Sequence, residues 1–231
     1  IKKKGKIEEK KAKNQLFFGI RGKEKIKKEL REGFIQPLRF YFQLLQLRNK
    51  KDSEELDAEQ LEKLVMYESL YEAYEAYQVS IPTGLLFYGP PGTGKTYIAK
   101  KLAEELGAGF IAKSMGEFGS SYVHQTSKNV HEFFEWAKNA SHGEPVMLFL
   151  DEIDSLVSKR TGNVDTQKAE EVSQFLQEFN ALESAPNLIV VAATNRPDHL
   201  DTAILRSGRL DKKFYIWPPD ETARKELFII H

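Results

Sequence analysis

Residues 89–96 read Gly89-Pro90-Pro91-Gly92-Thr93-Gly94-Lys95-Thr96. This run matches the pattern G-x-x-x-x-G-K-[ST], in which glycines let consecutive backbone N–H groups surround phosphate oxygens. It follows a short apolar strand predicted at residues 85–88 and opens a helix predicted to end near Leu106, so that the helix N-terminus adds positive potential. A structural turn would need neither Lys95 nor Thr96. The stretch therefore predicts a nucleotide site, with Lys95 on the β- and γ-phosphates and the Thr96 hydroxyl on Mg²⁺.

Two adjacent acidic residues follow a second apolar strand. Four apolar residues, 147–150, precede Asp151 and Glu152. An acidic side chain at the carboxyl end of a buried parallel strand faces the crevice where ligands bind in such sheets. The pair could merely end a strand at the surface, but its place downstream of a phosphate loop favours a functional role. We expect Asp151 to hold Mg²⁺, mostly through water, and Glu152 to polarise the attacking water.

Apolar strands alternate with helices from residue 82 onward. The strands are continuous apolar runs, which indicate a parallel sheet covered by helices on both faces. We predict an α/β fold with a five-stranded parallel sheet, its strands at residues 85–88, 110–112, 146–150, 188–193 and 214–217. Further helices are predicted at residues 127–140 and 167–182.

The first 80 residues have a different pattern. Ile26, Leu30 and Phe34 predict an amphipathic helix that begins at Lys23 and ends near Pro37. A second helix is predicted at residues 52–78, with Asp52 or Ser53 as its N-cap. Its apolar and aromatic side chains recur at three- and four-residue steps, at Leu61, Leu64, Tyr67, Tyr71 and Tyr74. This stripe is interpreted as a packing face, with a docking surface for a partner as the alternative.

The composition excludes several classes of protein. Lys plus Arg and Asp plus Glu are 34 each in 231 residues, so no net charge steers the chain toward nucleic acid or an acidic membrane. The absence of cysteine excludes disulfides and thiolate metal sites and fits an intracellular, cytoplasmic protein. No apolar run approaches the roughly 20 residues that span a bilayer. Residues 1–15 are charged and predict a linker; a basic nucleic-acid contact is the weaker alternative, because Glu8 and Glu9 interrupt the run.

Two downstream segments complete a resemblance to a known family. They are Val191-Ala192-Ala193-Thr194-Asn195-Arg196-Pro197 and Leu200-Asp201-Thr202-Ala203-Ile204-Leu205-Arg206-Ser207-Gly208-Arg209-Leu210-Asp211. With the phosphate loop and the acidic pair, they resemble the AAA family of P-loop NTPases over residues 17–40 and 80–231. The resemblance implies that Asn195 bridges the γ-phosphate and the lytic water. It also implies that Arg206 and Arg209 are arginine fingers that reach the site of a neighbouring subunit.

The same resemblance assigns three further segments. Gly19-Ile20-Arg21-Gly22 is similar to the adenine-side segment, with Ile20 against the base, although Arg21 stands where the family usually has glycine. Tyr97, directly after the phosphate loop, is included in the nucleotide contacts. Residues 121–124 resemble pore loop 1, whose Tyr122 and Val123 would grip a threaded polypeptide; His124 replaces the usual glycine. His124 has no partner at metal-ligand spacing, so no metal is assigned to it.

The resemblance also implies a domain organisation and a function. Residues 16–231 form the large ATPase subdomain with a helical insertion at about 43–77, and the small helical lid of the family is expected to be missing after His231. The expected function is that of a homo-hexameric ring that uses ATP and Mg²⁺ to unfold or disassemble protein substrates, with no nucleic-acid partner. One alternative is the ATPase segment of a membrane-anchored AAA metalloprotease. Another is a nucleotide-gated scaffold without turnover, against which the predicted catalytic residues argue.

Overall fold

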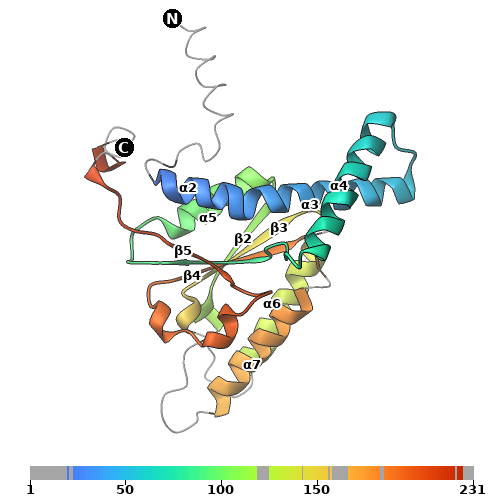
Figure 1. Ribbon diagram of the computed structural model, residues 1–231. Coiled ribbons are helices and arrows are strands. Elements are labelled where there is room, and N and C mark those ends of the chain that lie inside the picture. The colour runs from blue at the N-terminus through green and yellow to red at the C-terminus, as the bar shows by residue number, and fades with distance from the viewer. Residues whose placement is uncertain are drawn as a thin grey trace, which may run out of the picture.

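Five parallel strands form one sheet in a computed structural model that describes residues 20, 23–118, 125–141, 143–155, 157, 166–182, 185–221 and 223–225. The strands are β1 (Gly84–Tyr88), β2 (Gly109–Ser114), β3 (Val146–Asp151), β4 (Leu188–Thr194) and β5 (Lys212–Tyr215). Their order across the sheet is β2-β3-β4-β1-β5 (Figure 1). The predicted α/β fold with a five-stranded parallel sheet is confirmed.

The position of β5 differs from the predicted 214–217. The strand begins at Lys212 because its backbone pairs with β1 from Leu85↔Lys212 to Tyr88↔Tyr215. The N–H of Ile216 still donates to the Tyr88 carbonyl, but Pro218 and Pro219 follow and offer no N–H. The apolar pattern placed the strand too late, because β5 is an edge strand and exposes two lysines at its start.

Helices cover both faces of the sheet, and alternate residues of each strand supply two cores. Helix α5 (Lys95–Leu106) lies on one face with the long N-terminal helix, while α6 (Gln125–Ala140) and α7 (Thr166–Ala181) lie on the other (Figure 1). In β1, Leu85 and Phe87 belong to the core on the α5 face, and Leu86 belongs to the core on the face covered by α6 and α7. This two-sided burial explains why β1, β3 and β4 are runs of apolar residues up to the last residue of each strand.

The N-terminal helix was predicted to end near Pro37, but this prediction is wrong. The helix continues past the proline. Helix α2 (Glu24–Leu30) passes through a π-helical turn, η1 (Arg31–Ile35), into α3 (Gln36–Ser53). The N–H of Gln36 bonds to the carbonyl of Arg31, five residues back. This wider turn resets the hydrogen-bond pattern, so Pro37 falls in the first turn of α3, where its missing N–H is tolerated.

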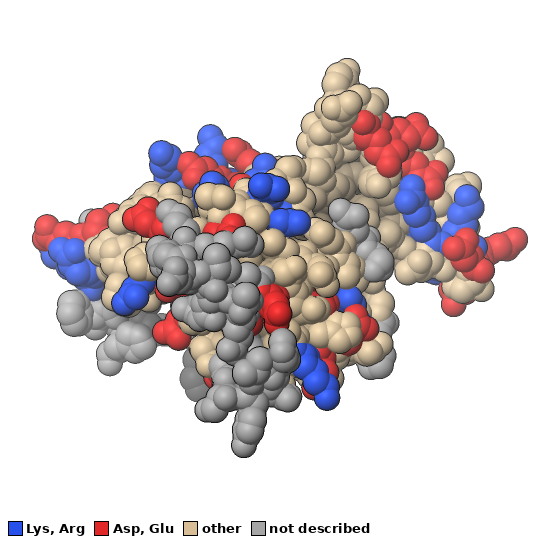
Figure 2. All heavy atoms as spheres, turned by 90° about the horizontal axis from the view of Figure 1, so that it is seen from below, with Lys and Arg blue, Asp and Glu red and all other residues tan. Residues whose placement is uncertain are grey.

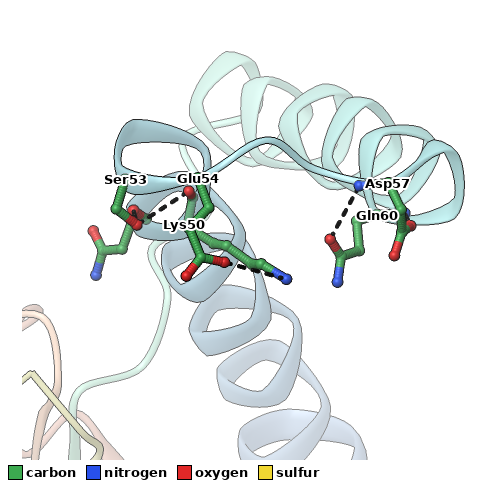
Figure 3. Close-up of polar contacts among 6 residues, drawn as sticks. Lys50, Ser53, Glu54, Asp57 and Gln60 are labelled. Atoms are coloured by element: carbon green, nitrogen blue, oxygen red, sulfur yellow. Dashed lines mark hydrogen bonds and ion pairs between the residues drawn. The ribbon is translucent and has the colours of Figure 1, made fainter.

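Helix α4 (Ala58–Ala76) begins later than predicted. Ser53 belongs to the last turn of α3, where its hydroxyl donates to the carbonyls of Asn49 and Lys50. The N-cap is Asp57, whose Oδ1 accepts from the N–H of Gln60 at 2.8 Å. In return, Gln60 Oε1 accepts from the N–H of Asp57 at 3.3 Å, the bond drawn between these residues in Figure 3. This reciprocal capping box, worth about 1 kcal/mol, fixes the start of α4.

Together α3 and α4 form a hairpin that projects from the sheet (Figure 1). The tyrosines of α4 face α3: the ring centroids of Tyr67 and Phe40 lie 5.8 Å apart, and those of Tyr71 and Tyr41 lie 6.0 Å apart. Leu64 is the buried residue of α4. The interpretation of the stripe as a packing face is therefore confirmed for Leu64 and the three tyrosines, which pack with α3, but not for Leu61, which is 48% exposed.

Two surface properties bear on the expected partners. Among the described residues on the face drawn in Figure 2, acidic and basic side chains are interspersed. Within the described residues, no helix combines the length and the apolar character needed to cross a bilayer.

Candidate nucleotide site

The predicted site residues meet at the carboxyl edge of three neighbouring strands. The phosphate loop leaves β1, Asn195 follows β4, and Asp151 ends β3. Because β4 lies between β3 and β1, these three ends are adjacent. The structure thus brings together residues from three separate sequence motifs.

The phosphate loop takes a shape that only glycine permits at two positions. Gly89 has a φ of 143°, and a Cβ there would lie 2.4 Å from the carbonyl oxygen of Ile216. Gly94 has a φ of 89° and is the N-cap of α5, with open space around it. The loop therefore packs its start against β5 and leaves its end open beside the helix N-terminus, where a phosphate fits.

Lys95 lies in the first turn of α5 and is 8% exposed. Its ammonium donates to the carbonyls of Gly89 and Pro90, both at 2.9 Å, and to Oδ1 of Asn195 at 2.6 Å. Burial lowers the pKa of Lys95, and the negative charge of Asp151 partly offsets this effect. The phosphate-loop lysine and the predicted γ-phosphate sensor are thus in direct contact.

Thr96 and Asp151 offer a site for a hard cation. The hydroxyl of Thr96 donates to Oδ2 of Asp151 at 3.2 Å. Hydroxyl and carboxylate oxygens are the donors that Mg²⁺ prefers, and both side chains lie partly or fully open to solvent. These two residues therefore fit a magnesium ion that arrives with its nucleotide.

Glu152 has an unusual backbone conformation. Its φ of 53° is left-handed, which costs a non-glycine residue about 1–3 kcal/mol. The conformation is held by bonds from the Glu152 N–H to Asp151 Oδ1 and from the Ser155 N–H to the Glu152 carbonyl, both at 2.9 Å. The side chain is held too, because Ser114 at the end of β2 donates to its Oε2 at 3.3 Å. Such fixed strain is typical of catalytic positions.

Hydrogen bonds of the buried Thr194 hydroxyl fix the position of the loop that carries Asn195. Thr194 is 1% exposed; its hydroxyl donates to Oδ1 of Asp154 at 2.6 Å and accepts from the N–H of Arg196 at 2.9 Å. The residues on both sides of Asn195 are therefore tied to the segment that follows Glu152. This link keeps the ends of β3 and β4 in fixed relation.

The two predicted arginine fingers have different surroundings in the structure. Arg209 donates to the carbonyl of Ala203 at 2.7 Å and to Oδ1 of Asn180, on α7, at 3.0 and 3.3 Å. Arg206 is exposed, and no described residue bonds to its guanidinium, although its backbone carbonyl accepts from the N–H of Arg209 at 3.1 Å. Neither guanidinium contacts the described residues of the nucleotide site of its own chain, as expected for a residue that acts on a neighbour.

The remaining predicted residues have varied surroundings. Within the loop, Thr93 is buried and donates to the Pro90 carbonyl at 3.0 Å, whereas Pro91 and Gly92 are exposed. Ile20 is 8% exposed and packs in the core formed with α5. Tyr97 is 48% exposed, beside Lys101. Contact of Ile20 and Tyr97 with the nucleotide stays a prediction, and Tyr122 and Val123 lie outside the described residues.

Three contributors to the site were not predicted from the sequence. They are Ser114, Asp154 and Asn180, which hold Glu152, Thr194 and Arg209 respectively. The position of Ser114 at the end of a strand, beside Asp151 in the β2–β3 register, was the only available signal for it. Asn180 lies in the last turn of α7 and carries no local signal.

Comparison with known proteins identifies the family. Residues 85–217 match the model of the ATPase family associated with various cellular activities (AAA). A cell division cycle protein 48 homolog of Archaeoglobus fulgidus is 45% identical over 161 residues, which are 69% of this chain and 22% of that protein. The proteasome-activating nucleotidase of Methanococcus vannielii is 41% identical over 163 residues, 69% of this chain and 39% of that protein. ATP-dependent zinc metalloprotease FtsH 2 of Thermoanaerobacter is 38% identical over 173 residues, 75% of this chain and 33% of that protein.

The chain thus spans well under half the length of these relatives. The family model nevertheless begins in β1, ends just after β5 and includes every strand of the sheet. It also includes the phosphate loop, Asp151, Glu152, Asn195 and both arginines. The chain belongs to the AAA family of ATPases.

Proposed function

We propose that this chain hydrolyses ATP with Mg²⁺ and works as a segment of a homo-hexameric ring that unfolds or disassembles protein substrates. One observation carries the chemistry: two hydrogen-bonded pairs, Lys95 with Asn195 and Thr96 with Asp151, lie at the same edge of the sheet, and Glu152 follows Asp151 in a strained conformation whose side chain is held by Ser114. A site used only to bind nucleotide would not need a carboxylate held in this way.

The residues have separate tasks in the proposed reaction. The backbone of residues 89–94 and the Lys95 ammonium hold the phosphates, so Lys95 exchanges its carbonyl partners for phosphate oxygens. Thr96 and Asp151 hold Mg²⁺, which neutralises charge on the β- and γ-phosphates when it is bound. The Glu152 carboxylate accepts a hydrogen bond from the attacking water and polarises it. Asn195 positions that water against the γ-phosphate. Arg206 of a neighbouring copy stabilises the charge of the transferred phosphoryl group.

The role in remodelling rests on the relatives and on the ring. Two of them are named as a proteasome-activating nucleotidase and an ATP-dependent metalloprotease, names that connect ATP use to the handling of proteins. The exposed Arg206 supports assembly, because a guanidinium that touches nothing in its own site requires a second copy to act. The likeness to the zinc metalloproteases keeps open the more specific role of an ATPase segment in such an enzyme.

Nucleotide affinity tests the first step. We expect Lys95→Ala to weaken binding of a fluorescent ATP analogue by about 10–100-fold, because each hydrogen bond to a charged group contributes about 1.5–3 kcal/mol. Lys100→Ala, which removes an exposed lysine from the same helix, should leave the affinity unchanged. Equal affinities for the parent and Lys95→Ala would show that nucleotide binds elsewhere.

A variant at the predicted pore loop tests the remodelling role. In the full-length protein we expect Tyr122→Ala to abolish ATP-driven unfolding of a tagged test protein and to leave basal ATPase within a few-fold. The reason is that an aromatic ring packs against many side chains at little cost in conformational entropy. Tyr122→Phe keeps the ring and should retain most of the unfolding. Unfolding by Tyr122→Ala at the parental rate would refute the pore assignment while leaving the ATPase proposal intact.

A further inference from the structure

A cluster of metal-ligating side chains lies on the helices opposite the α5 face of the sheet. His131 and Glu135 are one turn apart on α6, and Glu178 projects from α7. One ligand atom from each of the three lies within 4.8 Å of the others. None of the three belongs to the phosphate loop or contacts Asp151 or Glu152, and the proposed ATPase reaction does not use them.

The two helices hold this cluster on a rigid base. Phe134 of α6 packs against Phe175 and Phe179 of α7, with ring centroids 5.8 and 6.5 Å apart. All three rings are buried in the core beneath the sheet. The spacing of His131 and Glu135, four residues apart, places both on the same side of α6. The backbone positions from which the three side chains project are therefore fixed relative to one another, as a metal site requires.

Glu178 is the unusual member of the cluster. It is 4% exposed, and a buried carboxylate needs compensating partners. Its Oε1 accepts from Nε2 of Gln174 at 2.6 Å and lies 2.7 Å from Nδ1 of His131. Its Oε2 has no hydrogen-bond partner in the part of the chain that the structure describes. The carboxylate thus retains an unused acceptor next to a histidine and a second carboxylate.

We propose that His131, Glu135 and Glu178 bind a divalent transition-metal ion, with water in the remaining positions. One imidazole and two carboxylates form a donor set suited to Zn²⁺ and its first-row neighbours rather than to Mg²⁺. Gln174 would keep its bond to Glu178 and orient that ligand from outside. Lys138, whose ammonium lies 2.7 Å from Glu135 Oε1, would give up this contact to the ion. The ion would join α6 to α7.

Metal titration tests the site directly. With Mg²⁺ and ADP in excess, titration of the purified protein with Co²⁺ should give visible absorption bands that saturate at one ion per chain, and Zn²⁺ should remove them. His131→Ala and Glu135→Gln change half-exposed side chains, so both should fold; we expect each to weaken Zn²⁺ binding about tenfold or more in calorimetry. Glu132→Gln is the matched control, since Glu132 is exposed on the same helix and paired with Lys128.

Thermal melting gives a second readout that does not depend on ATPase activity. Because the site exists only in the folded chain, Zn²⁺ should raise the Tm of the parent and of Glu132→Gln but not that of His131→Ala. Equal Zn²⁺ affinities in the parent, His131→Ala and Glu135→Gln would overturn the proposal. The absence of saturable binding in the parent at about a hundredfold excess of Zn²⁺ would overturn it as well.

Discussion

Replacing Glu152 by Gln should leave ATP binding near that of the parent and lower the turnover rate about 10²–10⁴-fold. The amide keeps the size of the side chain and can accept the hydrogen bond from Ser114, so the local structure should persist. What it loses is the negative charge that polarises the attacking water. The measurement is single-turnover release of radiolabelled phosphate from the full-length protein, together with nucleotide affinity.

Two further variants make this test specific to Glu152. Glu144→Gln neutralises an exposed carboxylate just before β3, at the amino ends of the strands and away from the site. This variant should turn over ATP at the parental rate. Ser114→Ala removes only the hydroxyl that holds Glu152 and should give a smaller loss, with unchanged ATP affinity. Turnover by Glu152→Gln within threefold of the parent would exclude Glu152 as the residue that activates water.

The parts of the candidate site that sequence analysis could place in the fold are those encoded in short stretches. The phosphate loop carries its own backbone requirements, so Gly89 and Gly94 could be placed before any fold was known. Asp151 was predictable because a buried strand that ends in an acid has one favourable orientation in a parallel sheet. The order of the strands, which places the ends of β1, β3 and β4 side by side, comes from the structure and was not predicted from the sequence.

The parts that were missed depend on contacts between distant residues. Pro37 predicted a helix end, but the buried residues Phe34, Ile35 and Leu38 hold the helix against the sheet. The π turn before Pro37 shifts the hydrogen-bond pattern, so that the helix tolerates the missing N–H of the proline. The start of α4 depends on a choice among three nearby cap residues, which the reciprocal bonds of Asp57 and Gln60 decide. Tertiary packing and local hydrogen bonds, rather than propensity, settled both positions.

The structure also changes what is expected of the two arginines. The guanidinium of Arg206 is exposed and bonds to no described residue, so its removal should leave the Tm unchanged. Arg209 bonds to Asn180 and to the Ala203 carbonyl, so Arg209→Ala should lower the Tm in addition to any loss of turnover. The Tm therefore distinguishes an arginine that serves only the neighbouring subunit from one that also supports its own chain.

In the full-length protein, Arg206→Ala should bind ATP almost normally and lose about 10³–10⁵-fold in turnover, the range that a finger supplied in trans contributes. Lys95→Ala should fail for the opposite reason, since it binds the nucleotide weakly but still presents Arg206. Mixed rings of the two variants should regain part of the activity, because an intact pocket of an Arg206→Ala subunit then faces an intact finger of a Lys95→Ala subunit. The measurement is ATPase activity across mixing ratios, with native mass spectrometry to verify that the rings are mixed. Verified mixed rings without activity at any ratio would mean that Arg206 does not act between subunits.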